Sequence, residues 1–181
     1  MVDALRLIHQ DHVNLDKVLS VLLEVGGSLP DQRSETVSSL LADAIYYIEV
    51  FPERFHHPKE EKLLFPLVRK LRPELNEVID KLSEQHTQGE RAIAELAAAV
   101  KRLEGDWAAN RETVQDLVRT YVDAQWEHMR LEEREILKPI RQTLTKADFL
   151  SLNSAYGVSN DPLFGENLGT GFDALLRRIT R

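Results

Sequence analysis

Residues 55–66 read FHHPKEEKLLFP, two histidines followed one helical turn later by two glutamates, with phenylalanines and leucines around them. His56 and Glu60 are four residues apart, so on an α-helix their side chains lie on the same face, about 6 Å apart along the axis. The apolar neighbours predict that this face is buried. A buried face that carries an imidazole and a carboxylate needs partners for both groups.

Four long segments of the chain have the apolar periodicity of amphipathic helices. They are approximately residues 3–29, 34–71, 73–103 and 111–144. Short loops between long amphipathic helices favour antiparallel neighbours, so we predict an all-α fold, an up-down-up-down four-helix bundle. Pro52 and Pro58 lie inside the second segment and predict a kink or a break there.

Residues 145–181 differ from the rest of the chain. They contain two short helical patterns, near residues 146–156 and 172–179, around a loop that holds four of the chain's eight glycines. We therefore expect a bundle over residues 1–144 and a short C-terminal helical appendage over residues 145–181, packed on the outside of the bundle.

The composition excludes several classes of function. The chain has 181 residues, no cysteine and a formal net charge of −7. Without cysteine, any metal must be held by nitrogen and oxygen atoms. The negative charge disfavours nucleic-acid binding, and no apolar run reaches the roughly 18 residues that a membrane span needs. The N-terminus lacks the features of a signal peptide, and we expect a soluble, cytoplasmic protein.

The spacing of His56 and Glu60 recurs in the fourth segment. There, EHMRLEEREILKP (residues 127–139) places His128 and Glu132 four residues apart. Both HxxxE pairs are followed by a second glutamate and then by an apolar run toward a proline. The repeat is therefore chemical as well as structural, and it predicts that the second and fourth helices carry equivalent parts of one site.

The first and third segments each carry one histidine on the apolar face, His12 and His86. Counted at 1.5 Å per residue, these histidines and both HxxxE pairs lie roughly 14–20 Å from the same end of the bundle. Four imidazoles and two carboxylates thus meet in one layer. Two buried carboxylates without partners would destabilise the fold, whereas a pair of cations neutralises them and binds the imidazole lone pairs. We therefore predict a metal site.

The alternative is a core in which histidines and glutamates hydrogen-bond one another, but four helices would then have to match in level by chance. Imidazole together with carboxylate suits iron, manganese or zinc. The ferritin-like pattern, with Glu-x-x-His on two helices, does not fit, because Gln125 stands three residues before His128. The second glutamates of the two motifs, Glu61 and Glu133, are expected on the solvated face.

Four pieces of the chain, IHQDHVNL, FHHPKEEKLLFP, SEQHTQGE and EHMRLEEREILKP, together resemble hemerythrin-like proteins with an HHE cation-binding domain, and the tail resembles that of bacterial members. The resemblance implies a non-haem, oxo- or hydroxo-bridged centre of two iron ions inside a four-helix bundle. The donor atoms leave zinc or manganese as the alternative metals. It implies the histidine ligands His12, His56, His86 and His128 and the bridging carboxylates Glu60 and Glu132.

The ligand pattern departs from that of oxygen-carrying hemerythrins. Those proteins use five histidines, two of them as HxxxH on the third helix, where this chain has His86 and Glu90. Glu90 is thus either a further ligand or a solvated residue. The carriers also have aspartate where Glu132 stands here. Four histidines, two bridging carboxylates and an oxo bridge leave about two of roughly twelve positions on two iron ions open.

Within residues 55–66, His57 and Glu61 repeat the spacing of His56 and Glu60. We prefer His56 and Glu60 as ligands because the apolar stripe of the helix continues in their phase. A kink at Pro58 would instead turn His57 and Glu61 inward, so these two residues are the alternative ligands.

Three functions fit this pattern. We favour a di-iron protein that binds or reacts with a small molecule such as O2, NO or peroxide, in sensing, redox chemistry or detoxification. The second is iron handling, that is storage, sensing or donation of iron. The third is a binding module stabilised by a metal, whose mark would be an apolar patch near Phe164 and Phe172. No nucleophile–base triad or phosphate-binding loop is present, so the sequence assigns no enzymatic reaction, protein partner or reductase.

Overall fold

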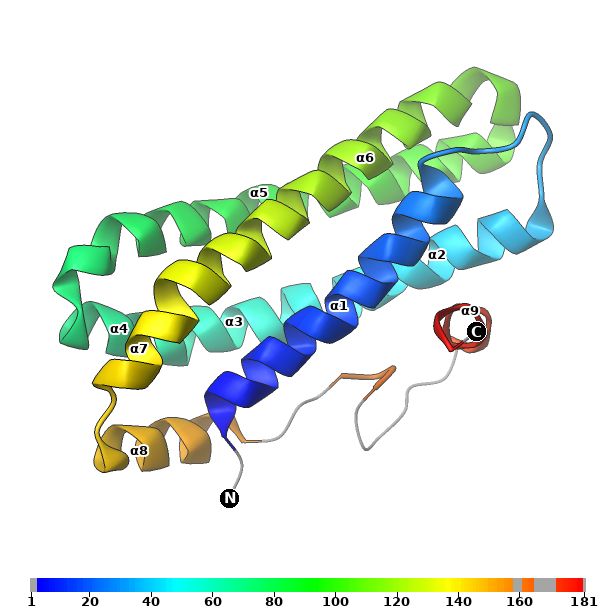
Figure 1. Cartoon of the computed structure of the whole chain (residues 1–181). Helices are drawn as coiled ribbons and strands as arrows, with labels where there is room; N and C mark the ends of the chain where they lie inside the picture. The colour runs from blue at the N-terminus through cyan, green and yellow to red at the C-terminus, as the bar shows by residue number, and fades with distance from the viewer. Residues whose placement is uncertain (1–2, 158–160, 165–171, 181) are drawn as a thin grey trace.

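The computed structural model describes residues 3–157, 161–164 and 172–180, and every regular element in these ranges is helical (Figure 1). Four long helical arms lie side by side. The first arm is α1 (Ala4–Gly26), and the second is α2 (Glu35–Val50) with η1 (Pro52–His56), α3 (His57–Lys59), η2 (Glu60–Leu64) and α4 (Phe65–Leu71). The third arm is η3 (Pro73–Leu75) with α5 (Asn76–Gly105), and the fourth is α6 (Trp107–Glu132) with η4 (Glu133–Leu137) and α7 (Lys138–Thr143). Helices α1 and α5 each pack against both α2 and α6.

The fourth arm begins at Trp107, earlier than the position near Arg111 that the apolar periodicity predicts. Asp106 caps this helix, because its side chain accepts a hydrogen bond from the backbone N–H of Ala109 at 3.1 Å. Trp107 is buried, and its indole N–H donates to the backbone carbonyl of Pro30 at 2.8 Å. A single capping residue thus replaces the longer loop expected between the third and fourth helices.

The second and fourth arms contain the π-helical segments η1, η2 and η4. These segments end two residues before Pro58, Pro66 and Pro139, respectively. A proline lacks the N–H of a helical residue and its ring clashes with the carbonyl four positions back. The backbone bonds that close these segments run to the residue five positions back, which gives the prolines room. The kink predicted at Pro52 and Pro58 therefore takes the form of one turn residue, Phe51, followed by continuous helix.

A polar layer separates the buried apolar side chains into two clusters. On α1 one cluster ends at Ile8 and the other begins at Leu15. On α5 the first ends at Leu82 and the second begins at Ile93. The histidines that the sequence singles out on these two helices lie in the gaps. The layer predicted from helical rise is therefore a physical boundary, with packed apolar side chains on both sides of it.

Two further helices, α8 (Lys146–Tyr156) and α9 (Asp173–Ile179), follow the fourth arm. Figure 1 shows α8 beside the N-terminus, and α9 packs against α1 and α2. Most of the loop predicted between them lies outside the described residues. Phe172 is buried and its ring stacks on that of Tyr46, with centroids 5.5 Å apart. Of the helices in the described ranges, none combines the length and the apolar character needed to span a bilayer.

Candidate metal centre

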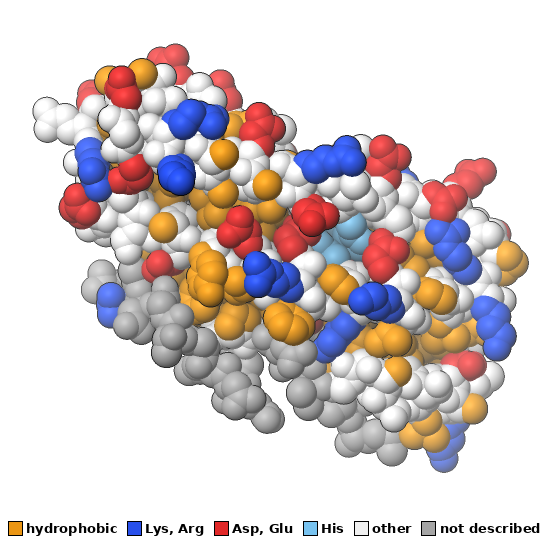
Figure 2. Space-filling view, turned by 180° about the vertical axis from the view of Figure 1, so that it is seen from behind, with side chains coloured by type: hydrophobic (Ala, Val, Ile, Leu, Met, Phe, Trp, Pro, Cys, Tyr) orange, Lys and Arg blue, Asp and Glu red, His pale blue; other side chains and the backbone are white. Residues whose placement is uncertain are grey.

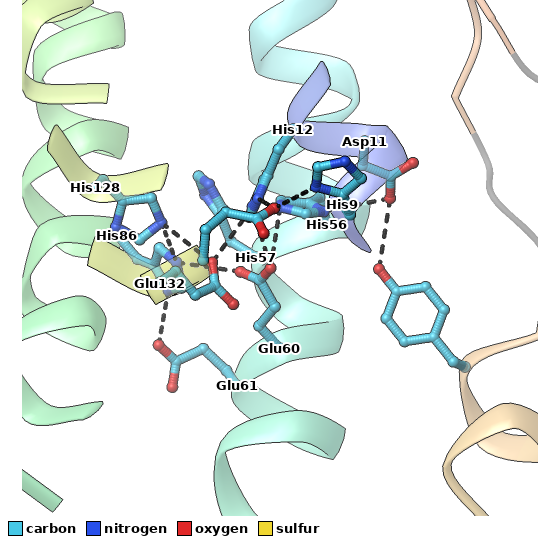
Figure 3. Close-up of polar contacts among 12 residues, drawn as sticks. His9, Asp11, His12, His56, His57, Glu60, Glu61, His86, His128 and Glu132 are labelled. Carbon is cyan, nitrogen blue, oxygen red and sulfur yellow. Dashed lines mark hydrogen bonds and ion pairs between the residues drawn. The ribbon is translucent and has the colours of Figure 1, made fainter. Parts of the chain in front are cut away.

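The four arms bring seven buried side chains together in the polar layer (Figure 3). They form two groups, and within each group the potential ligand atoms lie within 4.8 Å of one another. The two-histidine group consists of His12, His56, Glu60 and Glu132, and the three-histidine group consists of His57, His86 and His128. Both groups hold only nitrogen and oxygen donors, the set that suits iron, manganese or zinc.

All six primary ligand candidates from the sequence belong to these groups, and His57 is the seventh member. Consecutive residues of an α-helix point about 100° apart, so the sequence pattern treats His56 and His57 as alternatives. In the structure both rings are buried, and they flank the boundary between the π-helical segment η1 and α3. The remaining two candidates lie elsewhere: Glu90 is exposed on α5, and Glu61 is outside both groups.

Glu60 connects the two groups. Its Oε1 lies 3.0 Å from His56 Nε2 in the two-histidine group, and its Oε2 lies 3.3 Å from His86 Nε2 in the three-histidine group. The side chain has no exposed surface. One carboxylate that presents one oxygen to each group has the arrangement of a bridging ligand.

Glu132 is equally buried and also faces both groups. Its Oε2 lies 3.4 Å from His12 Nε2 and 3.9 Å from His128 Nε2. Burial raises the pKa of Glu132, and the negative charge of Glu60 raises it further. Two buried carboxylates that repel each other in this way indicate a place for positive charge.

Each of the five histidines contacts an oxygen acceptor outside the groups through its Nδ1 atom. The pairs are His12 with Glu133 at 2.9 Å, His56 with Asp11 at 3.3 Å, His57 with Glu53 at 3.4 Å, His86 with Glu61 at 2.8 Å, and His128 with Gln85 at 3.2 Å. Because the partner oxygens accept, each Nδ1 carries the hydrogen and donates it. Nε2 is then the atom left for a metal, which is the usual support of a metal-binding histidine.

Glu61 and Glu133 have a role that the sequence pattern does not predict. Instead of lying on the solvated face, they are half-buried, and they accept hydrogen bonds from His86 and His12, respectively. In each HxxxEE motif the first glutamate thus faces the groups, while the second holds a histidine of another arm. The doubling of the glutamate in both motifs is the signal in the sequence for this arrangement.

Six inward-facing atoms of the two-histidine group have no hydrogen-bond partner. They are the Nε2 atoms of His12 and His56 and all four carboxylate oxygens of Glu60 and Glu132. The 3.0 Å between His56 Nε2 and Glu60 Oε1 is an ion-pair distance, yet both atoms are acceptors when Nδ1 holds the only ring hydrogen. An acceptor that faces another acceptor requires a proton or a cation between them, so the side chains fit a bound metal.

In the metal-free protein, protons take over part of this role. Burial disfavours the charged form of His12, but the nearby carboxylate of Glu132 and the hydrogen bond to Glu133 outweigh burial and raise its pKa to about 9. Burial likewise opposes the charging of His56, yet the neighbouring carboxylates, Glu60 foremost, raise its pKa well above the ordinary value. A proton on each imidazole then offsets the buried negative charge.

The three-histidine group behaves differently. Burial lowers the pKa of His57 and of His128 well below the ordinary value, and the charges of neighbouring histidines lower both further. These two imidazoles are therefore neutral near pH 7, with lone pairs available to a cation.

On the face of the molecule that Figure 2 draws, histidine is visible only as a small patch between acidic and basic side chains.

A cavity of about 730 Å³ lies against the two-histidine group, between α1 and the fourth arm. It is lined by His9, His12, Trp126 and Glu133, among others. His9 is exposed, and its Nδ1 lies 2.9 Å from the same Glu133 oxygen that accepts from His12. Glu133 thus links His9 at the surface to His12, whose Nε2 faces the centre.

The family model described as the hemerythrin HHE cation binding domain matches residues 3–140 of the chain. The matched range contains all seven side chains of the two groups and ends before α8 and α9. A search of curated proteins returned no match.

Proposed function

We propose that this chain, which belongs to the hemerythrin HHE cation-binding family, is a non-haem di-iron protein that binds or reacts with a small molecule such as dioxygen, nitric oxide or peroxide. The family implies the binding of metal ions, typically iron. The observation that carries the proposal is the set of six buried acceptor atoms without hydrogen-bond partners on His12, His56, Glu60 and Glu132. Two cations would satisfy these atoms, since oxygen and imidazole donors suit iron.

The side chains divide between two ions. His57, His86 and His128 would hold one ion and His12 and His56 the other, with Glu60 and Glu132 shared between them. Five histidine ligands, two shared carboxylates and one shared oxygen would fill about eleven of roughly twelve positions on two iron ions. The inclusion of His57 thus reduces the expected open positions from two to one, on the two-histidine side. When bound, the iron pair supplies a redox centre and a Lewis acid.

The residues around the centre shield it from bulk water and leave a path to it for a small molecule. Apolar clusters on both sides of the layer exclude bulk water. The cavity is lined by His12 of the two-histidine group, where the open position is expected, so a small molecule would have a short path to it. Glu133, which accepts from His9 and His12, fixes the ring of His12 at the edge of this path. A small-molecule ligand accounts for this asymmetry better than a purely structural metal does.

An up-down-up-down order of the four arms belongs to the same proposal. The packing of α1 and α5 on both α2 and α6 supports it, because antiparallel neighbours joined by short loops pack in this way.

A cytoplasmic location without nucleic-acid or membrane partners stays a prediction from the charge of −7 and the apolar pattern. Burial of Phe172 removes part of the apolar patch that a binding module would need.

The test is to load the metal-free protein with ferrous iron without oxygen, and then to add dioxygen, nitric oxide or hydrogen peroxide separately. We expect at least one of them to change the absorption spectrum of the loaded protein, and the change to be lost in His12→Ala. Iron that passes readily to an apo-acceptor would favour iron handling instead. A tightly held metal that reacts with none of the three would leave only a structural role.

A further inference from the structure

A second cavity, of about 310 Å³, opens between α5 and α6 on the outer side of the three-histidine group. Gly89, Tyr121, Gln125 and His128 are among the residues that line it. The ring of His128 points its Nε2 toward the centre, so this cavity reaches the centre from behind the ring.

Two buried oxygens near this cavity have no hydrogen-bond partner: one belongs to Gln125, which lines the cavity, and the other to Glu53, which lies beside the lining residue Gly89. They are Oε1 of Gln125, a side chain that is only 4% exposed, and Oε1 of Glu53. The second carboxylate oxygen of Glu53 lies 3.4 Å from Nδ1 of His57. Buried acceptors without partners are rare in native proteins, and where a polar cavity adjoins them the usual partner is an ordered water molecule.

Gly89 provides the room. A Cβ atom at this buried position of α5 would lie 2.8 Å from Gln125 Nε2 and 3.8 Å from Glu53 Oε1, so both side chains face the same point of the α5 backbone. Glycine inside a helix is unfavourable relative to alanine, which calls for a packing reason. The reason here is that a side chain would fill the space between the two polar groups.

We propose that Gly89, Glu53 and Gln125 form a binding site for one water molecule, or for another hydrogen-bond donor of that size, which is supplied through the cavity between α5 and α6. One O–H of such a molecule would donate to Glu53 Oε1, and the Gln125 amide, whose Nε2 lies beside Gly89 and whose Oε1 has no partner, offers a second hydrogen bond. Dioxygen and nitric oxide carry no hydrogen to donate and do not match these groups. The bound molecule holds Glu53 in place, and Glu53 in turn orients His57. The site stands on hydrogen bonding alone, so it exists in the metal-free protein whatever the metal centre does.

The first test compares the melting temperatures of two variants of the metal-free protein. Gln125→Leu keeps the approximate size of the side chain but removes both polar atoms of the amide. Ser38→Ala is the matched control, because the Ser38 hydroxyl is also buried without a partner and does not line the described cavities. If a donor is bound, Gln125→Leu lowers the melting temperature by roughly 2–6 °C, while Ser38→Ala leaves it unchanged or raises it. An unchanged or higher melting temperature for Gln125→Leu overturns the proposal.

The second test is a crystal structure that resolves ordered water, for the wild-type protein and for Gly89→Ala. We expect one peak within hydrogen-bond distance of Glu53 Oε1 and the Gln125 side chain in the wild type, and none in the variant. An empty space, or a Gln125 side chain turned to donate directly to Glu53, overturns the proposal.

Discussion

The imidazole rings of His57 and His86 stack on each other, with centroids 4.2 Å apart and planes 18° apart. His57 comes from the second arm and His86 from the third, so the stack joins two arms at the metal centre. His57 is the third histidine of the three-histidine group, whereas the other group has two. The expected number of open positions, and hence the expected reactivity, depends on this fifth histidine.

We predict that His57→Ala weakens iron binding by at least about tenfold, because it removes a ligand of the three-histidine group. The measurement is the iron content per chain after loading and exhaustive dialysis. Glu90→Ala is the control, since Glu90 occupies the fifth-histidine position of the sequence pattern but is exposed. If Glu90→Ala loses iron and His57→Ala does not, the assignment is reversed.

Glu132→Gln should change stability in opposite directions with and without metal. Burial and the charge of Glu60 raise the pKa of Glu132, so the carboxylate destabilises the metal-free fold. Replacing it with a neutral amide should raise the free energy of unfolding of the metal-free protein, on the order of 1 kcal/mol. The same change removes a shared ligand and should abolish most of the stabilisation by iron. Urea unfolding of both forms checks this, and a loss of stability without metal would contradict it.

Variants of Glu61 test whether the hydrogen bond to His86 Nδ1 supports metal binding. Its Oε1 lies 2.8 Å from His86 Nδ1, and loss of such a partner typically weakens metal affinity by about 10–100-fold. We expect this loss for Glu61→Ala and a smaller one for Glu61→Gln, which keeps an acceptor oxygen. Glu84→Ala, on the exposed face of α5, should bind metal like the wild type. Metal titration in competition with a chelator gives the three affinities, and equal affinities for all three variants would exclude the supporting role.

Metal affinity should rise with pH up to about 9. In the metal-free protein, the nearby carboxylate of Glu132 and the hydrogen bond to Glu133 outweigh burial and hold the pKa of His12 at about 9. Below that pH the metal must displace the proton of His12, which costs about tenfold in affinity for each pH unit, and displacement of the proton on His56, whose pKa is also raised, makes the slope steeper. His57, whose pKa is lowered, adds no such proton near pH 7. Chelator competition between about pH 7 and about pH 9 measures the slope, and a flat profile would contradict the raised pKa of His12.

The tail outside the matched family range contacts Asp11, a residue that supports the centre. The Tyr156 hydroxyl of α8 donates to Asp11 Oδ2 at 3.5 Å, and the same oxygen lies 3.3 Å from His56 Nδ1. We predict that Tyr156→Phe lowers the free energy of unfolding by about 1 kcal/mol and changes the spectrum of the iron-loaded protein. Tyr46→Phe, at a half-exposed tyrosine, should do neither. A Tyr156→Phe protein that melts lower but has the wild-type spectrum would assign Tyr156 to packing alone.

The sequence predicts much of this architecture because helical rise and HxxxE spacing are local properties. They are sufficient to identify six of the seven side chains in the two groups. His57 needs more, because its inward direction depends on a π-helical turn that apolar periodicity does not encode. The pairs Glu61–His86 and Glu133–His12 join different arms, so no spacing along one helix reveals them. Tyr156 reaches Asp11 across 145 positions of the chain, and only the packing of α8 on α1 brings them together.

The most direct test of the di-iron claim is an anaerobic titration of the metal-free protein with ferrous iron, followed by metal analysis of the separated protein. We predict two iron ions per chain, with fewer in both His12→Ala and His57→Ala. One iron ion or none in the wild-type protein, or two in both variants, would contradict a centre built from the two-histidine and three-histidine groups.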